Sequence, residues 1–241
     1  MKTISSHWEH YLDEAFDYIE KTNIVEQLCS WLTILMYWPP FKEYSLFRES
    51  LAVTKKMGLP YRYECFRQMR SLFIIQKYMK KNNPTVLIIG DGYGFLSCLI
   101  KRVYPESNIV MVDLDKMLGI QSRYCDASYC HIEELKDLSM TFDLAINIHS
   151  MMEMNEEMIA YYFEYLRSHL NGLFYCQNRE KKVMIGGEVA EFSKYPWHKN
   201  DTHLVDEICP FVGRIVTPKF PFLHHLDGAI RHRLTILEEC R

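Results

Sequence analysis

The chain has 241 residues, of which 48% are hydrophobic and 24% are charged, and its formal net charge is −3. This length predicts one large α/β domain with a helical extension and a sizeable buried core. Because the Lys and Arg residues are scattered and the net charge is negative, nothing forms a basic patch, and we do not expect nucleic acid as a partner.

The cysteines and the apolar runs indicate in which cellular compartment the protein is expected. None of the eight cysteines forms a CxxC pair or a close-spaced Cys/His quartet, so they are expected to be free thiols of a reducing compartment. The longest apolar run, residues 31–38, is far shorter than the roughly 20 residues that span a bilayer, and no leader pattern is visible. We therefore expect a cytoplasmic protein without membrane association.

Residues 1–82 are predicted to be a helical N-terminal extension. One helix follows Ser5 and Ser6, a second covers about 24–37 and stops at Pro39-Pro40, and a third follows a loop and covers about 63–81. This extension is expected either to cap one edge of the sheet or to form a lid over a substrate site. A contact in a homodimer is a further alternative.

From residue 83 to 241 the pattern predicts a Rossmann-like domain with a mostly parallel sheet and helices on both faces. Seven strands are expected, at about 86–89, 109–113, 128–132, 142–148, 172–178, 211–216 and 233–237. The clearest helix in this part runs from 155 to 170, with Asn155 as its N-cap.

A glycine turn and a carboxylate lie at the ends of the first two strands. The first strand leads into the turn Gly90, Asp91, Gly92, Tyr93 and Gly94, and Asp113 ends the second strand, 19 residues after Gly94. Glycines permit positive φ and let a ligand approach the backbone, and an acid at the next strand end accepts ribose hydroxyls. The sequence therefore predicts a nucleotide-type site.

Glycines at offsets 0, 2 and 4 resemble the first motif of class I S-adenosylmethionine-dependent methyltransferases, whereas a dinucleotide fingerprint needs offsets 0, 2 and 5. The resemblance implies a seven-stranded sheet and S-adenosyl-L-methionine as cofactor, bound by residues 90–94, Asp113 and Asn147. Position 88 is Ile where the family commonly carries an acid, and Asp91 is expected to replace it near the cofactor's ammonium. This departure resembles the glycine loop of spermidine synthases, so aminopropyl transfer stays an alternative.

The segment 142–154 is similar to the Asn-x-x-Ser-Met-x-Glu-Met signature of a family of sugar O-methyltransferases found with polysaccharide biosynthesis. Together with weaker similarities on the fifth strand and around Pro196-Trp197, the resemblance covers about residues 85–200. It implies methylation of a hydroxyl on a sugar or a related small polar acceptor.

Methylation of a hydroxyl needs a group that accepts its proton, and Glu153 and His149 follow the fourth strand, where the acceptor is expected. Glu153 has the alternative role of capping the helix near residue 155. Contacts to the acceptor are predicted for Ser150, Asn178, Trp197 and His198, the last two in a polar loop that also holds His203. No metal site is expected. Other transfers from an adenosyl cofactor, including N-methyl transfer, and a non-catalytic binding module are the competing functions.

Overall fold

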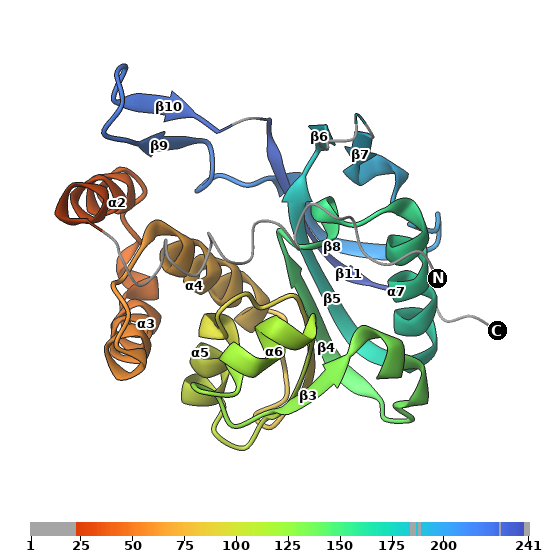
Figure 1. Ribbon diagram of the computed structural model, residues 1–241. Helices are drawn as coiled ribbons and strands as arrows, with labels where there is room; N and C mark the ends of the chain where they lie inside the picture. The colour runs from red at the N-terminus through yellow and green to blue at the C-terminus, as the bar shows by residue number, and fades with distance from the viewer. Residues whose placement is uncertain (1–22, 184–186, 188, 227, 239–241) are drawn as a thin grey trace.

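The computed structural model describes residues 23–183, 187, 189–226 and 228–238, so the helix predicted after Ser5 and Ser6 lies outside the described residues. Its elements are α2 (Ile24–Met36), η1 (Phe41–Glu43), α3 (Tyr44–Met57), α4 (Tyr63–Gln76), β1 (Thr85–Ile89), α5 (Phe95–Val103), β2 (Asn108–Asp113), α6 (Asp115–Gln121), β3 (Ser128–His131), η2 (Ile132–Asp137), β4 (Phe142–Ile148), η3 (Met151–Glu153), α7 (Glu156–His169), β5 (Leu170–Arg179), β6 (Lys181–Val183), β7 (Val189–Glu191), η4 (Phe192–Lys194), β8 (Thr202–Ile208), β9 (Arg214–Val216), β10 (Leu223–His225) and β11 (Ile230–Ile236) (Figure 1).

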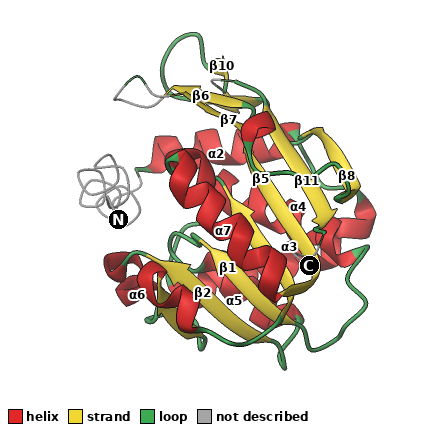
Figure 2. Ribbon diagram, turned by 90° about the vertical axis from the view of Figure 1, so that its right-hand side faces the viewer, coloured by secondary structure: helices red, strands yellow, loops and turns green. Residues whose placement is uncertain are grey.

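A seven-stranded sheet with the order β3-β2-β1-β4-β5-β11-β8 forms the centre of the molecule. The first five of these strands are parallel, whereas β11 is antiparallel to both β5 and β8. The sheet is covered by helices on both faces, as Figure 2 shows with α7 in front of the strands. This confirms the predicted Rossmann-like architecture with N-terminal helices.

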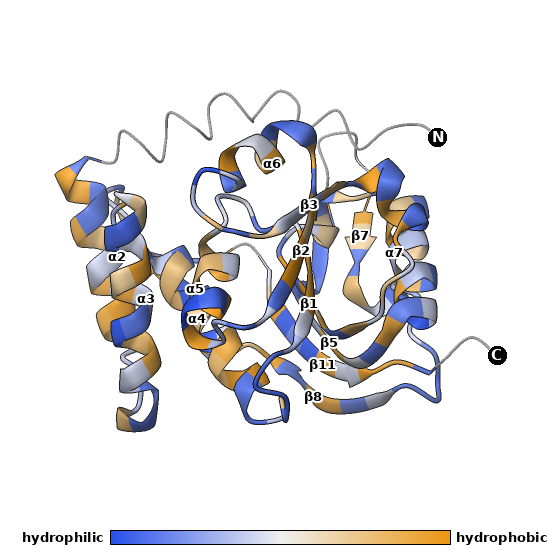
Figure 3. Cartoon of the chain, turned by 90° about the horizontal axis from the view of Figure 1, so that it is seen from below, coloured by the Kyte–Doolittle hydropathy of each residue, from blue (hydrophilic) through white to orange (hydrophobic). Residues whose placement is uncertain are grey.

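Successive side chains of the central strands face opposite helix layers, as the two-residue period of a strand requires. Val86 and Ile88 pack in the core under α3, α4 and α5, whereas Leu87 and Ile89 pack in the core under α7. Because both faces are buried, β1 is an unbroken apolar run over residues 86–89, and the neighbouring β2 is largely orange in the hydropathy colouring of Figure 3.

The N-terminal helices are part of the core on the first face. Phe66, Met69 and Leu72 of α4 are fully buried in the same cluster as Val86 and Ile146 of the sheet. The Tyr175 hydroxyl in β5 also donates a hydrogen bond to Ser71 Oγ in α4, at 3.1 Å. Helix α4 therefore covers a face of the sheet. None of the helices in the described part of the chain is long and apolar enough to cross a bilayer.

Two elements differ from the sequence-based expectation. Residues 44–57 form α3, where a loop was predicted, and α3 ends at Gly58, whose φ of 70° is left-handed. The stretch 211–216 is not a strand of the main sheet; its last residues form β9, which pairs with β10.

The seventh strand of the main sheet is instead β8, which begins within the predicted polar loop and continues to residue 208, where no strand was expected. This strand lies at the sheet edge with most of its side chains exposed, so it carries no apolar pattern. The apolar residues that follow it pack elsewhere. Phe211 and Val212 form a small cluster with Cys209 and Ile230, and β9 is fixed by α2, since Thr33 Oγ1 accepts from the Val216 amide at 2.8 Å.

Candidate cofactor and acceptor site

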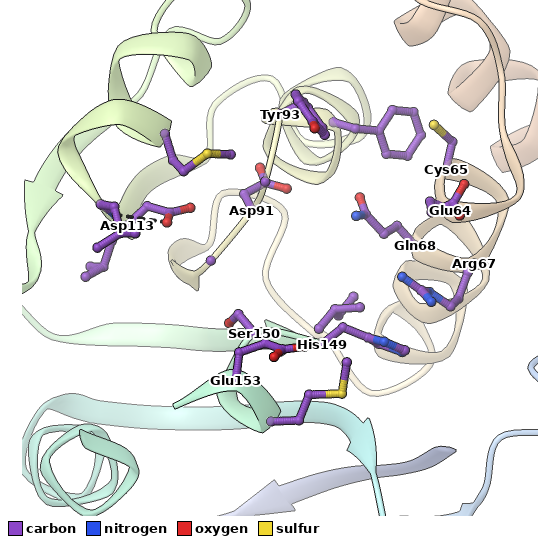
Figure 4. Close-up of a pocket in the computed structure, with 18 of the residues that line it drawn as sticks. Glu64, Cys65, Arg67, Gln68, Asp91, Tyr93, Asp113, His149, Ser150 and Glu153 are labelled. Atoms are coloured by element: carbon purple, nitrogen blue, oxygen red, sulfur yellow. Dashed lines mark hydrogen bonds between the residues drawn. The ribbon is translucent and has the colours of Figure 1, made fainter. Parts of the chain in front are cut away.

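A cavity of about 500 Å³ lies at the carboxyl ends of β1, β2 and β4, where parallel α/β sheets bind ligands (Figure 4). One side is formed by the glycine turn, by Asp113 and by the loop after β4. The opposite side comes from α3, α4 and the loop between them. Its lining includes Arg62, Glu64, Cys65, Arg67, Gln68, Gly90, Asp91, Gly92, Tyr93, Asp113, His149, Ser150, Glu153 and Tyr162.

The glycine turn exposes its backbone to this cavity. Gly90, Gly92 and Gly94 have φ values of 74°, 58° and 82°, a region that side-chain-bearing residues rarely adopt. A Cβ on Gly90 would overlap with Ser150, whereas a Cβ on Gly92 would meet no atom of the described residues within 4 Å. Gly90 is thus required for close packing with the loop after β4, and Gly92 faces open space.

Asp113 is held at the end of β2 with room for a ligand. Its Oδ1 accepts from the Leu114 amide at 2.9 Å, and its Oδ2 accepts from Gln121 Nε2 at 2.8 Å. The same Gln121 nitrogen donates to the Gly92 carbonyl at 2.9 Å, which ties β2 to the glycine turn. Burial raises the pKa of Asp113 to about 6. Hydrogen bonds from the backbone amides of Asp91 and Gly92 also reach this carboxylate and oppose the rise, and Asp113 lines the cavity.

Asp91 caps α5 from within the glycine turn. Its two carboxylate oxygens accept from the amides of Leu96 at 3.1 Å and Ser97 at 2.8 Å. Burial raises its pKa to about 7, and the nearby Asp113 adds to this rise. A positively charged ligand would stabilise both carboxylates in the ionised form. We call Asp91 and Asp113 the acidic end of the cavity.

Asn147 and Asn178 are fully buried and do not line the cavity, although both were predicted to contact a ligand. Asn178 Nδ2 donates to Asn147 Oδ1 at 2.8 Å, and Asn178 Oδ1 accepts from the Met152 amide at 3.1 Å. Asn147 Nδ2 and the Ser150 hydroxyl both donate to the Ile89 carbonyl, each at 2.9 Å. The two asparagines therefore hold the loop after β4 against β1, and only Ser150 of these three reaches the cavity.

His149 is presented to the cavity by a left-handed backbone, with a φ of 66° at a position that is not glycine. Such strained conformations persist only where the surroundings enforce them, and they are common at functional sites. Its Nε2 is buried and has no hydrogen-bond partner among the described residues. Burial, together with the positive charges of Arg67, Arg179 and Lys182, holds the pKa of His149 well below its usual value, so the imidazole is neutral at pH 7.

Glu153 lines the cavity in η3 and is almost fully buried. Its carboxylate forms an ion pair with Lys182 Nζ in β6. Helix α7 is capped by Asn155, whose side chain accepts from the Met158 amide at 2.8 Å. The predicted N-cap is thereby confirmed.

Trp197 and His198 do not line the cavity, although both were predicted to bind the acceptor. Trp197 packs against Phe163 with ring centroids 4.8 Å apart, in the core under α7. His198 instead contacts Glu238, and His203 Nδ1 lies 2.9 Å from Thr235 Oγ1. Their segment leads into β8, at the edge of the sheet opposite to β3, whereas the cavity lies at the ends of β1, β2 and β4. Within the described ranges, no three His, Cys, Asp or Glu side chains are grouped as a metal site requires.

The polar side chains of α4 are the part of the site that the sequence did not reveal. Arg67 and Gln68 line the cavity together with Cys65 and Glu64. Figure 4 shows Arg67, Gln68 and His149 away from Asp113, and we call these three residues the basic end of the cavity. In the sequence Arg67 and Gln68 occupy the polar face of an amphipathic helix, a pattern that equally describes a solvent-exposed face.

Comparisons with solved structures agree with this fold. Thermoplasma acidophilum 1320 has a TM-score of 0.56 and 13% identity, over 80% of this chain and 97% of that chain. A chain of the complex between the Haloferax volcanii Trm112 methyltransferase activator and a methyltransferase has a TM-score of 0.53 and 12% identity, over 70% and 89%. The PH0226 protein of Pyrococcus horikoshii OT3 has a TM-score of 0.51 and 18% identity, over 74% and 92%.

No family model matches the sequence, and no curated protein matches it either. Identities as low as those to the solved structures establish the fold alone. It is the Rossmann-like fold that class I S-adenosylmethionine-dependent methyltransferases share.

Proposed function

We propose that this protein is an S-adenosylmethionine-dependent methyltransferase that methylates a hydroxyl of a sugar or a related small polar acceptor. The observation that carries the proposal is a single cavity that joins the glycine turn and Asp113 to the buried, neutral His149. A transfer reaction needs a donor site and an acceptor site that share one enclosed space. The sugar is suggested by the resemblance of segment 142–154 alone.

The acidic end suits the cofactor. Asp113 lines the cavity beside the glycine turn, where its carboxylate can accept from a ribose hydroxyl, and Gly92 leaves space beside the turn. Asp91 offers negative charge to an ammonium or sulfonium group. S-adenosylmethionine would supply a methyl group on a positively charged sulfur, which an oxygen nucleophile can attack.

His149 is the stronger candidate for the base. A neutral imidazole accepts a proton, and its buried Nε2 lacks a partner in the described structure. Glu153 already shares its negative charge with Lys182, which makes its carboxylate a weaker acceptor. In the proposed reaction, the acceptor oxygen gains the methyl group and its proton moves to His149.

Asn147 and Asn178 act as positioning residues in this scheme. Their hydrogen bonds fix the loop that carries His149 and Ser150 against the last carbonyl of β1. Since a small misplacement of a reacting group is costly, this support keeps the base aligned with the acceptor.

Calorimetric titration of the purified chain tests the proposal. S-adenosylmethionine and S-adenosylhomocysteine should both bind, and the enzyme should then transfer a radiolabelled methyl group to at least one member of a panel of sugars. A clear preference for decarboxylated S-adenosylmethionine would instead indicate aminopropyl transfer. If none of these adenosyl compounds binds, the proposal is wrong.

A further inference from the structure

The basic end of the cavity contains polar atoms that the protein leaves unsatisfied. Nε of Arg67, Oε1 of Gln68 and Nε2 of His149 are all buried, and none of them has a hydrogen-bond partner in the described structure. All three residues line the same cavity. Because an unsatisfied buried polar atom costs about 1–3 kcal/mol, three of them in one cavity indicate a polar ligand.

Arg67 differs from three other arginines that reach into the interior. The guanidinium groups of Arg70, Arg167 and Arg233 lie within 2.6–2.8 Å of carboxylates from Glu43, Asp201 and Asp206. No such ion pair with Arg67 is present among the described residues. Partly buried charges are normally paired, so the missing partner of Arg67 is expected to come from a ligand.

The charges near Arg67 favour a negatively charged ligand group. Arg67, Arg179 and Lys182 all act on the His149 imidazole, and of these three Lys182 is neutralised by Glu153. Helix α4 contributes one carboxylate to the cavity lining, that of Glu64, which is exposed and acts on Tyr93 and Cys65. The cavity is therefore negative near the glycine turn and positive near His149.

This inference rests on the proposed function and names the class of its substrate. We infer that Arg67, together with Gln68, binds an oxyanion of the acceptor, a carboxylate or a phosphate carried beside the hydroxyl that His149 deprotonates. Guanidinium groups bind both kinds of oxyanion through two parallel hydrogen bonds, and rotation of the Gln68 amide presents a donor as well. The acceptor class is then a sugar acid or a sugar phosphate.

The carboxylate of the cofactor is a second source of an oxyanion. Arg62 acts on Tyr93 in the glycine turn, whereas Arg67 acts on His149 after β4, which places Arg67 on the acceptor side. An experiment can separate the two sources. The full chain, saturated with S-adenosylhomocysteine, is titrated with inorganic phosphate or acetate in a calorimeter at an ionic strength held constant with chloride.

Phosphate or acetate should bind the wild type, and Arg67→Gln should weaken this binding by about 10- to 100-fold because a charge-assisted pair is lost. Arg67→Lys should weaken this binding less, since lysine keeps the positive charge but lacks the planar guanidinium that donates two parallel hydrogen bonds. The control Arg102→Gln removes an arginine from the exposed surface of α5 and should bind like the wild type. In all three variants the affinity for S-adenosylhomocysteine should be unchanged.

Three outcomes would overturn the inference: no anion binding by the wild type, equal binding by Arg67→Gln, or equal losses in Arg67→Gln and Arg102→Gln. A fourth is weaker binding of S-adenosylhomocysteine to Arg67→Gln with unchanged binding of 5′-methylthioadenosine, which lacks the amino acid part. That result would assign Arg67 to the cofactor's carboxylate.

Two further measurements test the inference if Arg67→Gln does not fold or if the proposed cofactor does not bind. If Arg67→Gln does not fold, histidine-selective NMR of the wild type replaces it, because a bound anion should raise the pKa of His149, and His149→Gln identifies its signal. An unmoved pKa would count against the anion site. Anion titration without any adenosyl compound still reports on Arg67 if the proposed cofactor fails to bind, so the two proposals fail separately.

Discussion

Replacing Asp113 by Ala removes the carboxylate that we assign to the cofactor's ribose. This carboxylate lines the cavity and is held by hydrogen bonds from Leu114, from Gln121 and from backbone amides of the glycine turn. A hydrogen bond to a charged group contributes about 1.5–3 kcal/mol, so the loss of one such bond should weaken cofactor binding by about 10- to 100-fold. Gln121 keeps its bond to the Gly92 carbonyl, which continues to connect α6 to the glycine turn.

Calorimetry with S-adenosylhomocysteine measures this loss directly, and circular dichroism establishes that the variant is folded. Asp115→Ala is the matched control, because its side chain is 86% exposed and lies two positions further along the chain. If a folded Asp113→Ala variant binds with wild-type affinity, or if both variants lose affinity equally, Asp113 does not bind the ribose.

The remaining predictions concern the base, the buried acids and the glycine turn. With an acceptor identified, His149→Gln should lower kcat by about 10²–10⁴-fold and Glu153→Gln by less; the reverse order would assign the base to Glu153. Because burial raises the pKa of Asp91 from 3.8 to about 7, the free energy of unfolding of the ligand-free protein should fall as the pH rises through this range, since the unfolded chain ionises first. A cationic cofactor should lower that pKa and release protons near pH 7, seen as a binding enthalpy that depends on the buffer; equal enthalpies in all buffers would contradict this. Gly90→Ala should lower the free energy of unfolding by about 1–3 kcal/mol in urea denaturation, and adding Ser150→Gly should restore part of it; no recovery would mean that the overlap with Ser150 is not the cause.

The strands next to the glycine turn could be predicted closely because they are buried on both faces. The strand expected at 142–148 coincides with β4, and those expected at 86–89 and 109–113 begin within one residue of β1 and β2. An unbroken apolar run ending in glycine or in an acid is a strong local signal.

Two elements were not predicted: β8 has no such local signal, and the signal for α3 was present but incomplete. The exposed edge strand β8 is defined by its pairing with β11, more than twenty residues away, which no local pattern encodes. For α3 the signal was present, since Lys55 and Lys56 lie in its last turn and Gly58 follows its end. Ser50 and Thr54 interrupt its buried face and obscure its apolar period.

The sequence located residues of the cavity where they lie in the glycine turn or at a strand end, as for Gly92 and Asp113, whose ligand role stays a prediction. It was not predictable where contact depends on tertiary packing. Asn147 and Asn178 follow apolar runs like ligand-binding residues do, yet they turn inward and bond to each other. Arg67 lies more than twenty residues before the glycine turn in the sequence and reaches the cavity only because α4 packs on the sheet.

Helix α4 has one side buried in the core and another side that lines the cavity. Phe66, Met69 and Leu72 are buried in the interior, whereas Arg67 and Gln68 line the cavity. Redesign of acceptor preference can therefore vary positions 64, 65, 67 and 68 in a library while positions 66, 69 and 72 stay fixed. Grafting a foreign loop onto the surface would not achieve the same change, because the recognition surface belongs to a structural layer of the domain.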